Sequence, residues 1–201
     1  MMPSIRKPLR DATSRRSDAQ LVRESLDDPD RFDEVFTRHV QAIFVFACAR
    51  VGPDHAQDVV AETFIAAFRS RSRYAPSATS ARPWLYGIAA NTLRRHHEHE
   101  TRWLRRFASD SAGVVDDYDR SVDRVDADRA APKLARAIAT LSTDERDVLL
   151  MHVLGEMTHA QIADALGIRR GTAKSRLSRG RARLRALLPE LIDEPTRDDQ
   201  S

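Results

Sequence analysis

The segment that most constrains the fold of this 201-residue chain lies in its C-terminal half and begins at Thr158. Thr158 is a good N-cap for a short helix whose apolar residues Ile162 and Leu166 recur at helical spacing. Gly167 can end that helix, because glycine adopts the left-handed conformation of a helix C-terminus without strain. A second helix is then predicted to start at Gly171. Two helices joined by a tight, glycine-containing turn have the layout of a helix-turn-helix motif.

The second of these helices separates apolar from basic residues. Its apolar face is predicted to comprise Ala173, Leu177, Leu184, Leu187 and Leu188. Its other faces carry Lys174, Arg176, Arg179, Arg181, Arg183 and Arg185. No acidic residue lies between Ala165 and Pro189, although the whole chain has 33 basic and 30 acidic residues. This concentration of positive charge predicts binding to duplex DNA, and a solvated arginine-rich helix without a ligand is the alternative.

The rest of the composition favours small helical units. The chain contains 41% hydrophobic but only 6% aromatic residues, and no alternating run bounded by hairpin turns, so an all-α fold is expected. The single cysteine, Cys48, excludes an internal disulfide and fits a reducing cytoplasm. The chain contains no run of 18 consecutive apolar residues, so no membrane insertion is expected. Without a nucleotide loop, nucleophile elbow or zinc signature, we expect neither an enzyme nor a cofactor.

The first half of the chain predicts four helices after a disordered basic arm, residues 1–16. Ser17 and Gln20 form a capping box for the first helix, and Asp54 is predicted to cap the third. The four helices are expected at residues 17–27, 32–51 and 56–71 and from residue 83 onward. Ser80 and Pro83 together mark the start of the fourth helix. The apolar faces of the four helices predict a first core, between about Ala19 and Phe107, within a first domain, residues 17–108.

The second half begins with an acidic segment. Residues 109–128 contain seven aspartates and two arginines, which gives a net charge of −5 and predicts a flexible linker over residues 109–130. A second helical domain is expected at residues 131–190, with a helix from Pro132 to Leu141 and a capping box of Ser142 and Glu145. A polar tail, residues 191–201, ends the chain.

Both halves resemble the sigma-70 family of RNA polymerase sigma factors, and in particular its extracytoplasmic-function (ECF) group, which keeps only regions 2 and 4. Region 2.2 resembles D-H-A-Q-D-V-V-A-E-T-F-I-A-A-F-R, and regions 2.3 and 2.4 resemble R-P-W-L-Y-G-I-A-A-N-T-L-R-R. Region 4 resembles L-S-T-D-E-R-D-V-L-L and then I-A-D-A-L-G-I-R-R-G-T-A-K-S-R-L-S-R-G-R-A-R-L. Gly180 stands where the family usually has alanine.

The resemblance implies a function and partners. It predicts a region 2 helical bundle and a region 4 helix-turn-helix that bind core RNA polymerase and direct promoter recognition, DNA melting and transcription initiation. The expected partners are promoter DNA, the β′ clamp helices and β flap of the polymerase, and an anti-sigma factor. It assigns Asp58 and Glu62, four residues apart on one helix face, to the contact with the clamp helices.

The resemblance places recognition of the upstream (minus 35) promoter element on the basic helix. Lysine and arginine can donate to guanine, and serine to several partners. The base-facing candidates are Lys174, Ser175, Ser178 and Arg179. The phosphate-facing candidates are Arg170, Arg176, Arg181 and Arg183, with Gly171 and Thr172 offering backbone N–H groups.

The segment 74–81 and the helix after it resemble the part of the family that melts the downstream (minus 10) element and holds unpaired bases. Capture of single strands needs basic residues with pockets or aromatic platforms. The candidates are Arg69, Arg71, Arg73, Tyr74, Trp84, Asn91, Arg94 and Arg95. Trp84 also continues the apolar stripe of Leu85 and Ile88, so it could equally be a core residue.

Several alternatives remain at this stage. A signal-responsive helix-turn-helix regulator that binds DNA without polymerase is the second hypothesis, and an enzyme with a DNA-binding tail is the third. The residues His96, His97, Glu98, His99 and Glu100 could suggest a metal site, but neighbours on a helix point about 100° apart, so a polar helix end is favoured and no metal is expected. The acidic linker could be a tether, enter the positively charged cleft of the polymerase, or fold back on the basic helix.

Overall fold

The computed structural model describes residues 16–74, 80–96, 101–103, 133–134 and 136–188. The helices described over their whole length are α1 (Asp18–Glu24), η1 (Pro29–Arg31), α2 (Phe32–Val51), α3 (Pro53–Ser70), η2 (Arg71–Arg73), α4 (Arg82–Arg95), α7 (Thr143–Val153), α8 (His159–Leu166) and α9 (Arg170–Leu187). These described ranges contain no strand, so the predicted all-α fold class is confirmed. The predicted basic arm, acidic linker and polar tail lie outside them, apart from Arg16. No helix within them is both long and apolar enough to cross a membrane.

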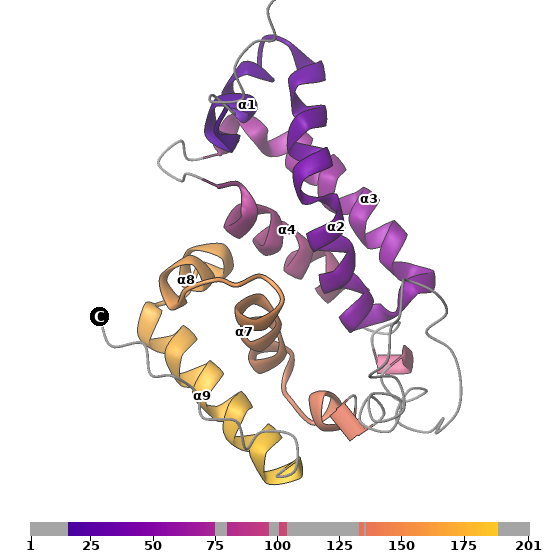
Figure 1. The fold of residues 1–201 in the computed structure, drawn as a ribbon, viewed down its shortest axis with the longest axis vertical. Helices are drawn as coiled ribbons and strands as arrows, with labels where there is room; N and C mark the ends of the chain where they lie inside the picture. Colours follow the sequence, from indigo (N-terminus) through magenta and orange to yellow (C-terminus); the bar gives the residue numbers. More distant parts are fainter. Residues whose placement is uncertain (1–15, 75–79, 97–100, 104–132, 135, 189–201) are drawn as a thin grey trace, which may run out of the picture.

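Helices α1 to α4 form the first bundle, with α2 and α3 as its long antiparallel pair (Figure 1). The bend between these two helices occurs at Gly52, whose φ of 79° is accessible to glycine without strain. The predicted cap at Asp54 is wrong. Helix α3 begins at Pro53 with Gly52 as its N-cap, because proline is preorganised for the first helical turn and its missing N–H needs no acceptor there.

Helices α7 to α9 form the second unit, which contains the predicted helix-turn-helix. The predicted capping boxes of Ser17 and Ser142 are present, and Thr158 forms one with Gln161. Gly167 ends α8 in the left-handed conformation, with φ 63°. Helix α9 begins at Arg170, one residue before the predicted start. Of the helix predicted at 132–141, the described residues 133–134 and 136–139 are helical, while Pro132 lies outside the described part.

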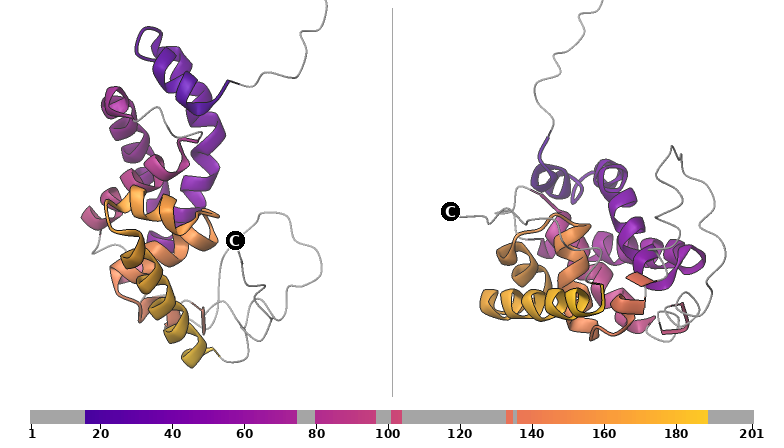
Figure 2. Two further views of the ribbon diagram at one scale, coloured as in Figure 1. Left: turned by 90° about the vertical axis from the view of Figure 1, so that its left-hand side faces the viewer. Right: turned by 60° about the horizontal axis from the view of Figure 1, so that its bottom comes forward.

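The two units pack against each other, and their buried residues form one continuous hydrophobic core. Helix α8 lies against α4 in Figure 1, and the two views of Figure 2 keep the C-terminal helices beside α4. The first core expected between about Ala19 and Phe107 therefore continues into the second unit. The contact is possible because Gly87 has no side chain: a Cβ atom there would lie 2.3 Å from the carbonyl oxygen of Ala165.

Polar contacts also join the two units. The fully buried guanidinium of Arg50 on α2 donates to the fully buried carboxylate of Asp147 on α7. Arg94 Nη2 on α4 donates to the second oxygen of the same carboxylate, at 3.2 Å. Arg82 Nη1 reaches the carbonyl oxygen of Gly155 at 3.2 Å. A buried charge is costly without a partner, so the Arg50–Asp147 pair can stay charged inside the protein only while the units are docked.

Candidate nucleic-acid interface

The exposed face of α9 carries most of the residues predicted to contact the minus 35 element. Its buried stripe consists of Ala173, Leu177, Gly180 and Leu184. Lys174, Ser175, Ser178 and Arg170 are all exposed. Leu187 was predicted on the apolar face, but it is 51% exposed, because Leu188 takes the buried place in the last turn.

Three arginines of α9 pair with the first turn of α7. Arg176 binds Asp144, and the buried carboxylate of Glu145 binds Arg183 Nη1 at 2.7 Å and Arg179 Nε at 3.4 Å. Burial alone would raise the pKa of Glu145, but its hydrogen bonds within the Ser142 capping box and the nearby arginine charges lower it. Glu145 therefore stays ionised and holds two basic side chains along α9.

The sequence contained only one signal for this arrangement. Glu145 is recognisable as the last member of a capping box, but its pairing with α9 depends on the packing of α7 against α9. Nothing in the sequence marked Asp144 as a partner of α9. The pairing leaves Arg179 and Arg183 more than half exposed, so both can still meet DNA, whereas Arg176 is mostly covered.

The start of α9 differs in one respect from the prediction. The N–H of Thr172 donates to the carbonyl oxygen of Arg169 at 2.9 Å, because the helix begins earlier than expected. It is therefore not available to a phosphate, and the hydroxyl is the remaining polar group of this half-buried side chain. The neighbouring Ser175 hydroxyl donates to the Thr172 carbonyl at 3.0 Å.

The residues predicted to contact the minus 10 element fall into two groups: one lies near the ends of segment 75–79, which is outside the described part, and the other lies at the C-terminal end of α4. Tyr74 and the half-buried Trp84 pack against each other, with ring centroids 4.9 Å apart. Arg69 and Arg73 are exposed. Arg71 instead stacks on Phe68 and donates to backbone carbonyls, so it supports the fold.

The C-terminal end of α4 carries residues predicted at the minus 10 site, and it also contacts Glu62, which was predicted at the polymerase contact. Arg94 Nη1 donates to Asn91 at 2.8 Å and also reaches Asp147, as described above. Arg95 and His96 bind the carboxylate of Glu62 on α3, at 3.2 and 3.1 Å. Glu62 is thus half-covered by an intramolecular network, whereas Asp58, its predicted partner at the polymerase contact, is exposed.

No metal centre emerges from the described residues. Within them there is no group of three or more side chains that could ligate a metal ion. Of the histidine-rich stretch only His96 is described, and it binds Glu62; His97 to Glu100 lie outside the described ranges.

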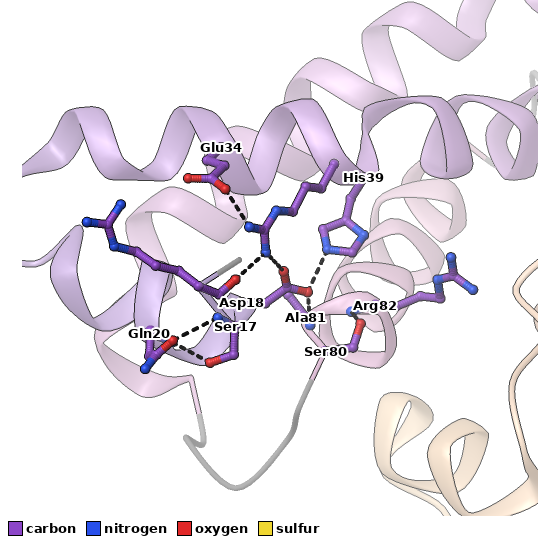
Figure 3. Close-up of polar contacts among 10 residues, drawn as sticks. Ser17, Asp18, Gln20, Glu34, His39, Ser80, Ala81 and Arg82 are labelled. Atoms are coloured by element: carbon purple, nitrogen blue, oxygen red, sulfur yellow. Dashed lines mark hydrogen bonds and ion pairs between the residues drawn. The ribbon is translucent and has the colours of Figure 1, made fainter. Parts of the chain in front are cut away.

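A buried carboxylate network, which the sequence analysis missed, ties α1 to the start of α4 (Figure 3). Asp18 accepts hydrogen bonds from the backbone N–H of Ala81 at 2.7 Å and from Arg38 Nη1 at 3.0 Å, and lies 2.7 Å from His39 Nε2. Burial would raise the pKa of Asp18, but these hydrogen bonds and the charge of His39 hold it well below its ordinary value. The Ser17 capping box marked the neighbouring residue, yet the partners of Asp18 are distant in sequence.

Comparison with known proteins places these features in a family. The Sigma-70 region 2 pattern matches residues 35–111, and the Sigma-70, region 4 pattern matches residues 132–184. RNA polymerase sigma factor CarQ of Myxococcus xanthus is 33% identical over 174 residues, which cover 84% of this chain and 95% of CarQ. ECF RNA polymerase sigma factor SigL of Mycobacterium tuberculosis is 31% identical over 160 residues, covering 78% and 88%.

Two solved structures share the fold. CnrH in complex with the cytosolic domain of CnrY has a TM-score of 0.63 at 24% identity, and covers 86% of this chain and 97% of that one. The sigma factor RpoE in complex with the anti-sigma factor NepR, from Bartonella quintana, has a TM-score of 0.59 at 23% identity, with coverage of 81% and 98%.

Proposed function

The chain belongs to the ECF group of the sigma-70 family of RNA polymerase sigma factors, and from this premise we propose how its surfaces divide the work of transcription initiation. It is a sigma factor that binds core RNA polymerase and directs promoter recognition. The observation that carries this function is the presence of both regions in the family's order. A helix-turn-helix regulator without polymerase binding has no support in the first half, which matches region 2.

The two regions correspond to the two helical units. We assign residues 17–108 to region 2 and residues 131–190 to region 4, joined by the acidic linker at 109–130. The family matches at 35–111 and 132–184 support this division. We place the protein in the cytoplasm with its polymerase, and propose that it acts as an initiation factor without catalytic residues, cofactor or metal.

Region 4 is proposed to read the minus 35 element through α9. Lys174, Ser175 and Ser178 are the strongest candidates for base contacts, because their side chains are exposed near the start of the helix. Arg179 lies on the same surface but shares Glu145 with Arg183. The phosphate contacts are proposed for Arg170, Arg181 and Arg183, with Arg176 and Thr172 at the edge of the surface.

Region 2 is proposed to hold the polymerase and the melted strand. Asp58 is the exposed acidic candidate for the β′ clamp helices, with Glu62 beside it; the β flap remains the proposed partner of region 4. For the minus 10 element, the exposed or half-exposed candidates are Arg69, Arg73, Tyr74, Trp84, Asn91, Arg94 and Arg95. Arg71 is kept as a candidate because it lies beside Arg69 and Arg73 in the chain, although its guanidinium donates to the backbone carbonyls of Ser25 and Phe68.

Regulation by an anti-sigma factor is part of the proposal. A neighbour in fold, RpoE of Bartonella quintana, has been solved with the anti-sigma factor NepR. The acidic linker remains a prediction, with the cleft, fold-back and tether hypotheses all open. Replacing its seven aspartates by asparagine should impair initiation in the first case, tighten free DNA binding in the second, and change neither in the third.

The test is transcription by core polymerase and this protein across a promoter library. Lys174→Ala should relax preference at the minus 35 element, with a loss of about 1–3 kcal/mol for a good base contact. Arg183→Ala should weaken binding to all sequences alike and reduce the salt slope by about 1. No transcription from any promoter would contradict the function, whereas unchanged selectivity in Lys174→Ala would contradict only the assigned face of α9.

A further inference from the structure

We propose that Asp18 is a positioning residue for promoter opening, although it belongs to α1, which carries none of the candidate DNA contacts. Its carboxylate holds the start of α4, the helix that presents Trp84, Asn91 and Arg94. This inference rests on the proposed role of α4 at the minus 10 element. It adds a residue that acts through the geometry of the site rather than by touching DNA.

Helix α4 has no side-chain cap of its own. The N-cap residue is Ala81, which has no side chain able to accept a hydrogen bond at the helix start. Asp18 Oδ2 accepts the N–H of Ala81 at 2.7 Å, from an element 63 residues away in sequence. Ser80 Oγ accepts the next N–H, of Arg82, at 3.2 Å. The start of α4 is thus fixed by a charged acceptor from another helix (Figure 3).

The Asp18 carboxylate that accepts this hydrogen bond is itself firmly held. Asp18 is only 6% exposed, and its two oxygens are both occupied, by Arg38 on one side and by His39 with Ala81 on the other. Arg38 is itself held by Glu34 and by the carbonyl oxygen of Arg16. Hydrogen bonds to an ionised group are roughly twice as strong as neutral ones, so the carboxylate is a firm anchor.

The anchor also bears on the aromatic pair beside the 74–81 connection. Asp18 binds Ala81, three residues before Trp84, and Tyr74, at the other end of the connection, packs on Trp84 with ring centroids 4.9 Å apart. Asp18 therefore fixes the start of α4 and with it the place of Trp84. Capture of a single strand uses aromatic platforms, so an error in this geometry falls on DNA melting.

The competing explanation is that Asp18 merely stabilises region 2. The two explanations differ when the promoter is already open. If Asp18 positions α4 for melting, a pre-opened promoter should restore initiation, whereas a fold defect would reduce assembly and initiation on every template.

The experiment uses full-length protein, core polymerase and a promoter that the wild-type holoenzyme selects from the library. Three readouts are compared: holoenzyme assembly, permanganate reactivity of the minus 10 region on duplex promoter, and initiation from the same promoter with a mismatched, pre-opened minus 10 region. Asp33→Asn is the matched control, because Asp33 is an exposed carboxylate in the first turn of α2.

We expect Asp18→Ala to reduce opening of the duplex promoter by about tenfold or more, the effect of losing one hydrogen bond to a charged group. Assembly should be unchanged, and the pre-opened promoter should bring initiation to within about twofold of wild type. Asp33→Asn should match wild type on all templates.

Two further variants keep the proposal testable if Asp18→Ala does not fold. Asp18→Asn keeps the size and can still accept the Ala81 N–H, so its defect should be smaller but again confined to duplex promoter. His39→Ala removes a neighbour and leaves the Ala81 bond, so it should open duplex promoter better than Asp18→Asn does. Equal losses on duplex and pre-opened promoters, or lost assembly in these variants, would overturn the proposal. Failure of the wild-type protein to initiate would instead contradict the proposed function.

Discussion

Replacing Gly87 by alanine should separate the two units without unfolding either of them. Gly87 lies in the middle of α4, where a Cβ atom would sit 2.3 Å from the carbonyl oxygen of Ala165 on α8. An ordinary contact is 3.4 Å or more, so the two helices would have to move apart by about 1 Å. The obstacle is a backbone atom within a helix, which cannot turn aside as a flexible side chain could.

The magnitude follows from two opposing effects. Alanine is favoured over glycine inside a helix by about 0.5–1 kcal/mol, which stabilises α4 itself. Overpacking of a close contact costs about 1–3 kcal/mol, and this cost falls only on the docked state. The equilibrium between docked and separated units should therefore shift by roughly 5- to 150-fold toward separation.

Energy transfer between dyes on α3 and α9 measures this shift. Cysteines introduced at Gln57 and Ala186, both exposed, would carry the dyes after Cys48 has been replaced by alanine. Gly87→Ala should lower the transfer efficiency and keep the helical content. Because α8 packs on α4 at Gly87, one helical turn before Asn91, the free variant should also bind single-stranded minus 10 DNA more tightly.

The chain offers a matched control in Gly180, which lies inside α9. A Cβ atom there would be 3.8 Å from Glu145, an ordinary contact. Gly180→Ala should leave energy transfer unchanged and raise the thermal stability slightly. Unchanged transfer in Gly87→Ala, or an equal loss in both variants, would refute the argument from close packing.

Three further predictions test other contacts. Asp147→Ala should weaken docking by about 3–5 kcal/mol, because it removes the carboxylate that the buried guanidinium of Arg50 binds across the two units. A denaturation profile in which region 4 unfolds no earlier would contradict this. Asp58→Arg should prevent assembly with core polymerase and keep the fold. It is a cleaner test than Glu62→Arg, which also breaks contacts to α4. Normal co-elution of Asp58→Arg with core polymerase on gel filtration would disprove the assigned contact. The lowered pKa of Asp18 predicts that its contribution to the free energy of unfolding is present above about pH 4 and is lost as the pH falls further below its ordinary pKa of 3.8. Urea unfolding at several pH values should therefore show a weaker acid dependence of stability in Asp18→Asn than in the wild type. An equal acid dependence in the two proteins would count against the network.

Much of the local structure could be predicted because its causes lie within a few residues. The capping boxes of Ser17 and Ser142, the left-handed Gly167, and the apolar spacing of α2 all act over one or two helical turns. The charge segregation on α9 is likewise a property of one segment. These features, with the resemblance to regions 2 and 4, were enough to predict the fold class and the family.

The neighbours of each charge depended on the tertiary structure. Asp147 looked like one more polar residue of a helix, yet it is fully buried against Arg50, 97 residues earlier in the chain. Glu62 was predicted on an exposed face and is held by Arg95 and His96. Spacing along a helix determines which residues lie on the same face, but not what packs against that face.

The sequence by itself therefore determined the helices, most of their caps and the basic face of α9, because these depend on propensity and periodicity over short distances. Only the tertiary structure decided that the two units share one core, that α8 crosses α4 at Gly87, and that Asp18 binds the start of α4. The physical reason is that burial, close approach and ion pairing are properties of surfaces brought together from distant parts of the chain, where a single missing Cβ or one buried carboxylate decides the fit.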